Sequence, residues 1–133
     1  MEGQLKPEVS MELRDRAYHC GRLMAVLAGL QAEALPDVKA GVIQRYYAAA
    51  STTPALVFGR LVRGAQPHLS KVGDQRPGLK VWYERQMSEI CGRIGTSMPT
   101  TLSLEDQSLF ALGYYQQLAA RWAGKDKDEK GEQ

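Results

Sequence analysis

The sequence has 133 residues, of which 44% are hydrophobic and 24% charged, and this length and composition are typical of one globular domain. Its longest apolar stretch, residues 23–30, falls well short of the roughly 20 residues that a membrane-spanning helix requires, so we expect no transmembrane helix. Residues 1–10 contain two glutamates and no apolar core, unlike a secretory signal, and the two distant cysteines favour a reducing cytoplasm over a disulfide scaffold.

Positive charge is concentrated in one part of the sequence. The formal net charge is +2, but residues 124–133 hold three Lys and four acids and contribute −1, which leaves +3 on the remainder. No acid occurs between Asp37 and Asp74, an interval that contains Lys39, Arg45, Arg60, Arg63, His68 and Lys71. Because an ordinary solvated face mixes both signs, this interval is a candidate surface for an anionic partner.

Two helices are predicted in the N-terminal part of the chain. The first covers about 7–35, where apolar residues recur in steps of four and three at Leu13, Ala17, Cys20, Met24 and Leu27. Pro36 cannot continue that helix. Asp37 is therefore predicted to be the N-cap of a second, short helix that ends near Ser51.

The third predicted helix begins with Thr53 as its N-cap and Pro54 at its first position. One of its faces is apolar, with Phe58, Leu61, Ala65 and Leu69. Another face is a basic stripe, with Arg60, Arg63, Pro67 and Lys71 at steps of three, four and four. Pro67 removes one helical hydrogen bond, and we favour a kink there over the end of the helix.

Two further helices follow, each preceded by a predicted loop. Residues 73–78 have loop composition, and the next helix buries Tyr83, Met87, Ile90 and Ile94. A second loop covers 95–101. Ser103 and Asp106 then resemble a capping box that opens a fifth helix through Leu109, Leu112, Leu118 and Trp122.

The expected fold class is all-α. Five helices, no alternating strand pattern and no internal repeat predict a single five-helix bundle over residues 1–123. The charged residues 124–133 are predicted to form a disordered C-terminal tail.

Few residues have the pattern of a catalytic or metal site. His19 and His68 fall in different helices, and the two cysteines, Cys20 and Cys91, are predicted to be small buried residues, so no metal site is expected. Glycine-rich phosphate loops and paired carboxylates on one helix face are missing too. The sequence therefore favours a protein that is not an enzyme and binds no cofactor.

The aromatic residues are predicted to fill the core. They could stack on bases, but aromatic side chains at helical spacing more often pack inside a bundle. This prediction covers Tyr46, Tyr47, Trp82, Tyr83, Tyr114, Tyr115 and Trp122.

Three stretches, YYAAASTTPALVFGRLVRGAQPHLSKV, VWYERQMSEI and TLSLEDQSLFALGYYQQ, carry a family resemblance. From about residue 16 to 122, the chain resembles the C-terminal helical region of the large subunit of type I-C CRISPR Cascade. A chain beginning at Met1 is similar to the separate small subunit that such systems make by internal initiation within the large-subunit gene. The resemblance implies that copies lie beside the large subunit and the RNA-bearing backbone subunits and stabilise the R-loop, while guide pairing reads the target sequence.

The resemblance extends to individual residues of the third helix. Arg60, Arg63, Gln66, His68 and Lys71 match the family pattern, whereas Gly64 and Pro67 depart from it. These departures affect the straightness of the helix and leave its charges in place.

Two functions follow as hypotheses. In the first, the chain makes sequence-independent contacts to phosphates of the displaced non-target DNA strand through Arg60, Arg63, Lys71, Arg45, Arg76, Lys80 and His68. In the second, the chain is a scaffold that bridges the backbone and large subunits without touching DNA, with basic residues docking on acidic surfaces: Arg22, Arg85, Arg93 and Arg121. Neither function involves a membrane.

Overall fold

The computed structural model describes residues 6–38 and 41–131, and it describes side chains from residue 12 to residue 120 except at 39, 40 and 44. Its elements are five helices: α1 (Lys6–Ala34), α2 (Val42–Thr52), α3 (Pro54–Gln75), α4 (Pro77–Ile94) and α5 (Leu104–Gly131). The described residues contain no strand, which confirms the predicted all-α class. Within this part of the chain, no helix is long and apolar enough to cross a membrane.

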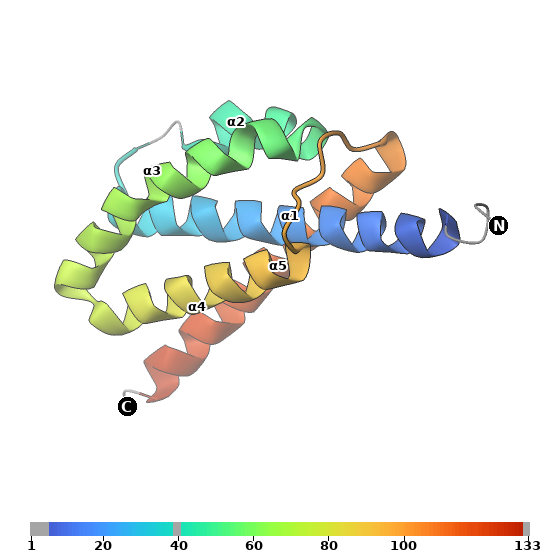
Figure 1. Cartoon of the computed structure of the whole chain (residues 1–133). Helices are drawn as coiled ribbons and strands as arrows, with labels where there is room; N and C mark the ends of the chain where they lie inside the picture. Colours follow the sequence, from blue (N-terminus) through green and yellow to red (C-terminus); the bar gives the residue numbers. More distant parts are fainter. Residues whose placement is uncertain (1–5, 39–40, 132–133) are drawn as a thin grey trace.

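α1 is the central helix of the bundle. All four other helices pack against it (Figure 1). As a result, five successive residues from Leu23 to Leu27 are buried, although the sequence indicated only one apolar face. A helix that is apolar on every side is one that its neighbours enclose. Of the residues on the predicted apolar face of this helix, Leu13 near the N-terminus is 37% exposed and is not part of the core.

α1 and α5 cross at two glycines. A Cβ on Gly21 would lie 1.8 Å from the carbonyl oxygen of Phe110, and a Cβ on Gly113 would lie 2.0 Å from the carbonyl oxygen of Tyr18. Such separations are far below van der Waals contact, so only glycine permits the backbones to approach this closely. This crossing directs Phe110, Tyr114 and Gln117 into the core, whereas Leu112 is 47% exposed.

Two helix junctions have the same construction. Thr53 joins α2 to α3 and Arg76 joins α3 to α4, each as a single non-helical residue before a proline, with φ and ψ of −133° and 67° and of −136° and 74°. A residue before proline avoids helical dihedrals, while the proline itself suits the first position of the next helix. The predicted loop over 73–78 is therefore wrong, because Pro77 restarts a helix one residue after α3 ends.

Thr53 occupies the predicted N-cap position but makes a different hydrogen bond. Its Oγ1 donates to the carbonyl oxygen of Ala49, at 3.1 Å, and it makes no side-chain cap to α3. Pro54 lacks an N–H, so this terminus has one fewer backbone donor without a helical partner.

α3 continues through Pro67 without interruption, so the helix does not end there, and the favoured kink stays a prediction. Pro67 is exposed, so the carbonyl group of Arg63, which loses its helical partner, lies on the solvent side of the helix. Water can therefore satisfy this carbonyl group, which explains why the helix tolerates an internal proline.

The predicted N-cap at Asp37 is wrong. α2 begins at Val42, and Gly41 is its N-cap. The Gln31 side chain of α1 accepts a hydrogen bond from the Val42 N–H through Oε1, at 2.6 Å. A side chain of the neighbouring helix α1 thus caps the start of α2, where the sequence predicted a cap by a residue next to the helix.

The connection before α5 is anchored to the α2–α3 junction. The Leu102 N–H donates to the carbonyl oxygen of Thr52 at 2.9 Å, and the Ala55 N–H donates to that of Pro99 at 3.0 Å. The Ser103 hydroxyl oxygen then accepts from the Asp106 N–H at 3.1 Å, which confirms the predicted cap of α5.

The backbone of α5 is helical to Gly131 and so runs through most of the predicted tail, residues 124–133. Residues 132 and 133 lie outside the described residues, as do the side chains from 121 onward, including those of Arg121 and Trp122. The division between the bundle and a disordered tail at residue 123 stays a prediction.

Candidate nucleic-acid interface

α3 has two faces of opposite character. Its buried face holds Phe58, Leu61, Ala65 and Leu69, as the spacing predicted, together with Pro54 and Val72. Arg60, Arg63 and Lys71 are exposed and lie on the other side of the helix, together with Pro67. Because successive helical positions differ by about 100°, these residues fall within one narrow sector opposite the buried face. We call Arg60, Arg63 and Lys71 the α3 stripe.

The α3 stripe makes no ion pair with any residue whose side chain the structure describes. Among the described residues, ion pairs join Arg14 to Glu105, Asp15 to His19, Glu89 to Arg22 and Arg93, and Glu33 to Arg76. The stripe takes no part in them, and neither do Arg45, exposed on α2, and Lys80, half-buried on α4. These five cations therefore keep their charge available to an external anion.

The stripe also lies on an open helix surface. A Cβ on Gly59 or Gly64 would meet nothing within 4 Å. At Gly73, in contrast, a Cβ would lie 2.5 Å from Cδ of Lys80. The aliphatic part of Lys80 thus packs on α3 at Gly73, which lies on a different side of the helix from Lys71.

His68 adds no charge to this surface at neutral pH. Burial lowers the pKa of its half-buried side chain below the ordinary value of 6.5, and nearby Lys71 lowers it further. A neutral imidazole can donate or accept a hydrogen bond, but it does not attract phosphate as a cation does.

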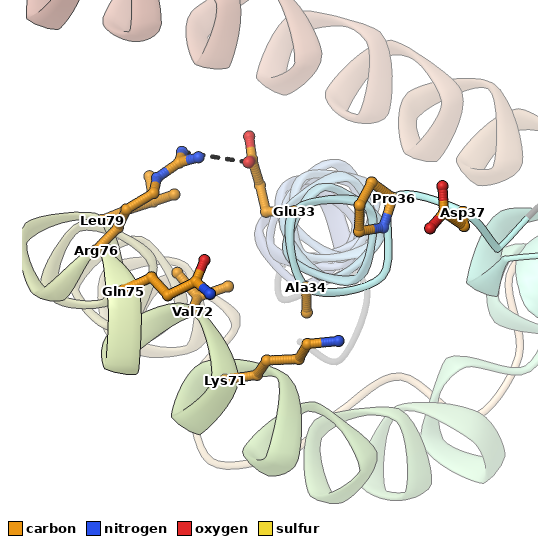
Figure 2. A pocket seen from close by; sticks show the side chains of 9 residues that line it. All are labelled: Glu33, Ala34, Pro36, Asp37, Lys71, Val72, Gln75, Arg76 and Leu79. Carbon is orange, nitrogen blue, oxygen red and sulfur yellow. Dashed lines mark ion pairs between the residues drawn. The ribbon is translucent and has the colours of Figure 1, made fainter.

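Arg76 is the one proposed cation with an internal partner among the described residues. Its guanidinium group lies 3.2 Å from a carboxylate oxygen of Glu33 in α1, whose side chain is only 12% exposed. Figure 2 shows this pair beside a cleft of about 290 Å³, which Lys71 and Asp37 also line. Folding thus brings two acids next to the interval that lacks acids in sequence, and nothing in the local pattern around residues 33–37 signals this proximity.

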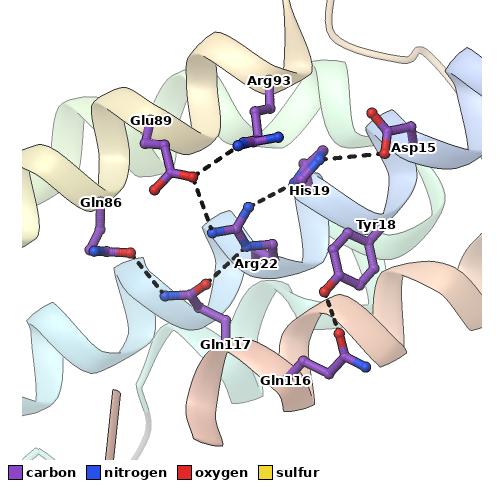
Figure 3. Close-up of polar contacts among 9 residues, drawn as sticks. All are labelled: Asp15, Tyr18, His19, Arg22, Gln86, Glu89, Arg93, Gln116 and Gln117. Atoms are coloured by element: carbon purple, nitrogen blue, oxygen red, sulfur yellow. Dashed lines mark hydrogen bonds and ion pairs between the residues drawn. The ribbon is translucent and has the colours of Figure 1, made fainter. Parts of the chain in front are cut away.

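A polar network joins α1, α4 and α5 away from this surface (Figure 3). Arg22 lies at its centre: Nε donates to Gln117 Oε1 at 2.9 Å, one terminal nitrogen lies 3.0 Å from Nδ1 of His19, and the other lies 3.8 Å from Glu89. Since arginine only donates, Nδ1 of His19 accepts and the ring carries its proton on Nε2, toward Asp15. The Arg22 side chain is 16% exposed, so it serves the fold and is not available for the docking role considered above.

The remaining candidates for chemistry divide between core and surface. Cys20 is buried, and burial raises the pKa of its thiol to about 12, whereas Cys91 is exposed, contrary to prediction, because Ile90 and Ile94 take the buried face of α4. Tyr83 and Tyr114 are buried, as predicted, but Tyr115 is 66% exposed. The searched residues contain no group of three or more His, Cys, Asp or Glu that could hold a metal ion.

The helices that carry this basic surface fall within a match to a known protein family. The model of the CRISPR-associated protein family Cas_Csd1 matches residues 2–122, nearly the whole chain. The chain belongs to this family. Cas_Csd1 is the family of the type I-C large subunit, so the chain is a part of a type I-C CRISPR system and works within a Cas complex. A search of curated proteins finds no match.

The Cas_Csd1 match covers the whole of the candidate surface. It includes α2, α3 and α4 in full and therefore every predicted nucleic-acid-binding residue from Arg45 to Lys80. The structure brings Lys71 and Arg76 to one cleft at the α3–α4 corner, whereas Lys80 packs on another side of α3 at Gly73, and Arg60 and Arg63 lie nearer the start of α3. Arg45 lies on α2, which packs against α3.

Proposed function

We propose that this chain is the non-catalytic small subunit of a type I-C RNA-guided surveillance complex, and that its α3 stripe binds the phosphate backbone of the displaced non-target DNA strand. The observation that carries the proposal is the state of Arg60, Arg63 and Lys71: they are exposed, share one helix face and pair with none of the acids that the structure describes. Contacts to phosphate alone are independent of sequence, as expected where guide RNA reads the target.

The dimensions of the stripe suit a short single-stranded segment. Arg60 and Lys71 are 11 positions apart, which corresponds to about 16 Å along a helix axis. Arg45 on the adjacent helix supplies a fourth free cation. Four phosphate contacts on a single strand predict a log–log salt slope of roughly −3, or about fiftyfold weaker binding between 50 and 200 mM salt.

The binding free energy from four phosphate contacts is sufficient to stabilise an R-loop. Exchange of a DNA duplex for an RNA–DNA heteroduplex is nearly balanced in free energy, so a few kcal/mol of backbone contact decides whether the open state persists. Three or four contacts seldom overcome the entropy of association alone, and we therefore expect the isolated chain to bind weakly and the assembled complex to bind tightly.

The test is a reconstituted complex carrying R60A/R63A/K71A in this chain. The matched control is R14A/R85A/R93A, which removes the same charge from other exposed positions. We expect both complexes to have the full subunit mass, and only the stripe variant to lose target affinity. Equal target affinity of the two variants would contradict the proposed function, and failure of the stripe variant to assemble would place the α3 stripe at a protein interface.

A scaffold function is the second candidate, and one observation favours it. Leu104, Leu112 and Tyr115 of α5 are 83%, 47% and 66% exposed, and their spacing places them on one side of the helix. Exposed apolar side chains that gather on one face are typical of a protein interface. Under this proposal the α5 surface packs against a neighbouring subunit, while contacts to DNA are made by other chains.

A further inference from the structure

Among the proposed DNA-binding cations, Arg76 is the one that already pairs with a carboxylate of the described residues. Its guanidinium group pairs at 3.2 Å with Glu33, and the two side chains differ strongly in exposure, 53% for Arg76 and 12% for Glu33. The carboxylate is thus held by the bundle, while much of the guanidinium group remains open to solvent. Another anion can reach Arg76 from the solvent side without moving α1.

The pair is located where the α3 stripe ends. Lys71 and Arg76 both line the cleft in Figure 2. A strand that follows the stripe toward the C-terminus of α3 therefore arrives at Arg76, with Glu33 already bound there. A carboxylate and a phosphate present similar oxygens to arginine, so the two anions compete for the same donors.

Resting on the function proposed above, we infer that Glu33 acts as an internal substitute for a DNA phosphate on Arg76. In the free chain it neutralises the guanidinium group and keeps Arg76 out of the binding surface. A backbone phosphate has to displace this carboxylate, so Arg76 contributes less to binding than an unpaired arginine does. Glu33 thereby limits the affinity of the surface for single strands that do not follow the full stripe.

The inference predicts a gain of binding when Glu33 loses its charge. In E33Q the side chain keeps its size but no longer neutralises Arg76. The full chain is titrated into a labelled oligothymidine strand between about 50 and 200 mM salt. We expect E33Q to bind roughly threefold to tenfold more tightly at the lower concentration, with a salt slope steeper by about 0.7, the value for one added phosphate contact on a single strand.

Two variants separate release of Arg76 from a general change in charge. Asp37 lines the same cleft, but the described partner of Arg76 is Glu33, so D37N removes one negative charge without releasing the guanidinium group. We expect D37N to leave the salt slope unchanged. In the R76A background, E33Q should give no gain, because the arginine that it releases is missing.

The outcomes distinguish this inference from the function on which it rests. If the stripe variant R60A/R63A/K71A loses binding but E33Q equals wild type, binds more weakly, or matches D37N in slope, only the role of Glu33 is overturned. If wild type and the stripe variant bind the strand equally, both proposals are overturned. Thermal unfolding of each variant checks the fold, and E33D, which keeps the charge but shortens the side chain, provides a second variant with an expected smaller gain.

Discussion

Gly113 of α5 lies against the main chain of Tyr18 in α1, where a Cβ would come within 2.0 Å of the carbonyl oxygen. Neither backbone can move aside without separating the two helices. We therefore predict that G113A lowers the free energy of unfolding by at least about 2 kcal/mol, since overpacking costs 1–3 kcal/mol even where side chains can adjust. Urea unfolding followed by circular dichroism measures the change.

Gly64 provides the control for this prediction. It lies inside α3, and a Cβ there would meet nothing within 4 Å. G64A should therefore stabilise the chain by about 0.5–1 kcal/mol, because glycine is unfavourable in an open helix interior. If G113A and G64A change stability in the same direction, the close crossing of α1 and α5 is wrong.

Arg22 is predicted to be the most important cation for stability. R22A removes its bond to Gln117, which is 4% exposed, and leaves a buried amide oxygen without its donor. We expect a loss of about 2–3 kcal/mol in the free energy of unfolding. Chemical denaturation at neutral pH tests this value.

Arg93 is the matched comparison for Arg22. It pairs with the same acid, Glu89, at 3.2 Å, but its side chain is 59% exposed. An exposed pair contributes little after solvent screening, so R93A should cost less than about 1 kcal/mol. A loss from R93A as large as that from R22A would show that burial does not decide the contribution of these ion pairs.

Stability is predicted to fall on mild acidification. Burial lowers the pKa of both His19 and His68 below 6.5, so the unfolded chain binds protons more readily than the folded one. The contribution of each histidine is complete above about pH 6.5 and is lost as pH falls toward its lower folded-state pKa, with a slope of at most about 1.4 kcal/mol per pH unit for each residue.

The measurement is the free energy of unfolding between about pH 7.5 and 5.5, above the range where carboxylates titrate. His19 is 6% exposed, and H19Q removes its titration while keeping a side chain that can accept from Arg22. The variant should show a shallower dependence than wild type. Identical pH profiles for the two chains would contradict the assignment of a neutral, buried His19.

The exposed apolar residues of α5 give a prediction about assembly. L112E/Y115E changes two solvent-facing positions, so the isolated chain should keep its thermal stability. If the α5 surface packs on a neighbouring subunit, buried charge will weaken that contact, and the chain will be lost from the complex during size-exclusion chromatography. Full retention of the variant would leave the scaffold hypothesis without its supporting surface.

Local signals in the sequence predicted most of the helices. Pro54 marked the start of α3, Ser103 the cap of α5, and the apolar steps from Phe58 to Leu69 the buried face of α3. Pro77 is the same signal as Pro54, but the two glycines around it suggested a loop. At this junction the proline determined the start of the next helix, and the nearby glycines did not produce a loop.

The remaining features depend on contacts between helices, which no local pattern encodes. Gly21 and Gly113 are 92 positions apart and have meaning only at the crossing of α1 and α5. The pairing of Arg76 with Glu33 is similar, because an acid-free interval in sequence can still face acids in space. The exposed position of the α3 stripe was predictable from helical periodicity, but the difference between its free cations and Arg76 was not.

The salt dependence of single-strand binding is the most direct test of whether the α3 stripe binds phosphates of nucleic acid. The full chain and R60A/R63A/K71A are titrated with an oligothymidine strand at several concentrations between about 50 and 200 mM. We predict that log K falls with log salt concentration with a slope of roughly −3 for wild type. For the variant we predict a slope shallower by about 2, because three phosphate contacts are lost. A flat response of the wild type, or equal slopes for the two chains, would contradict a role of the α3 stripe in binding nucleic acid.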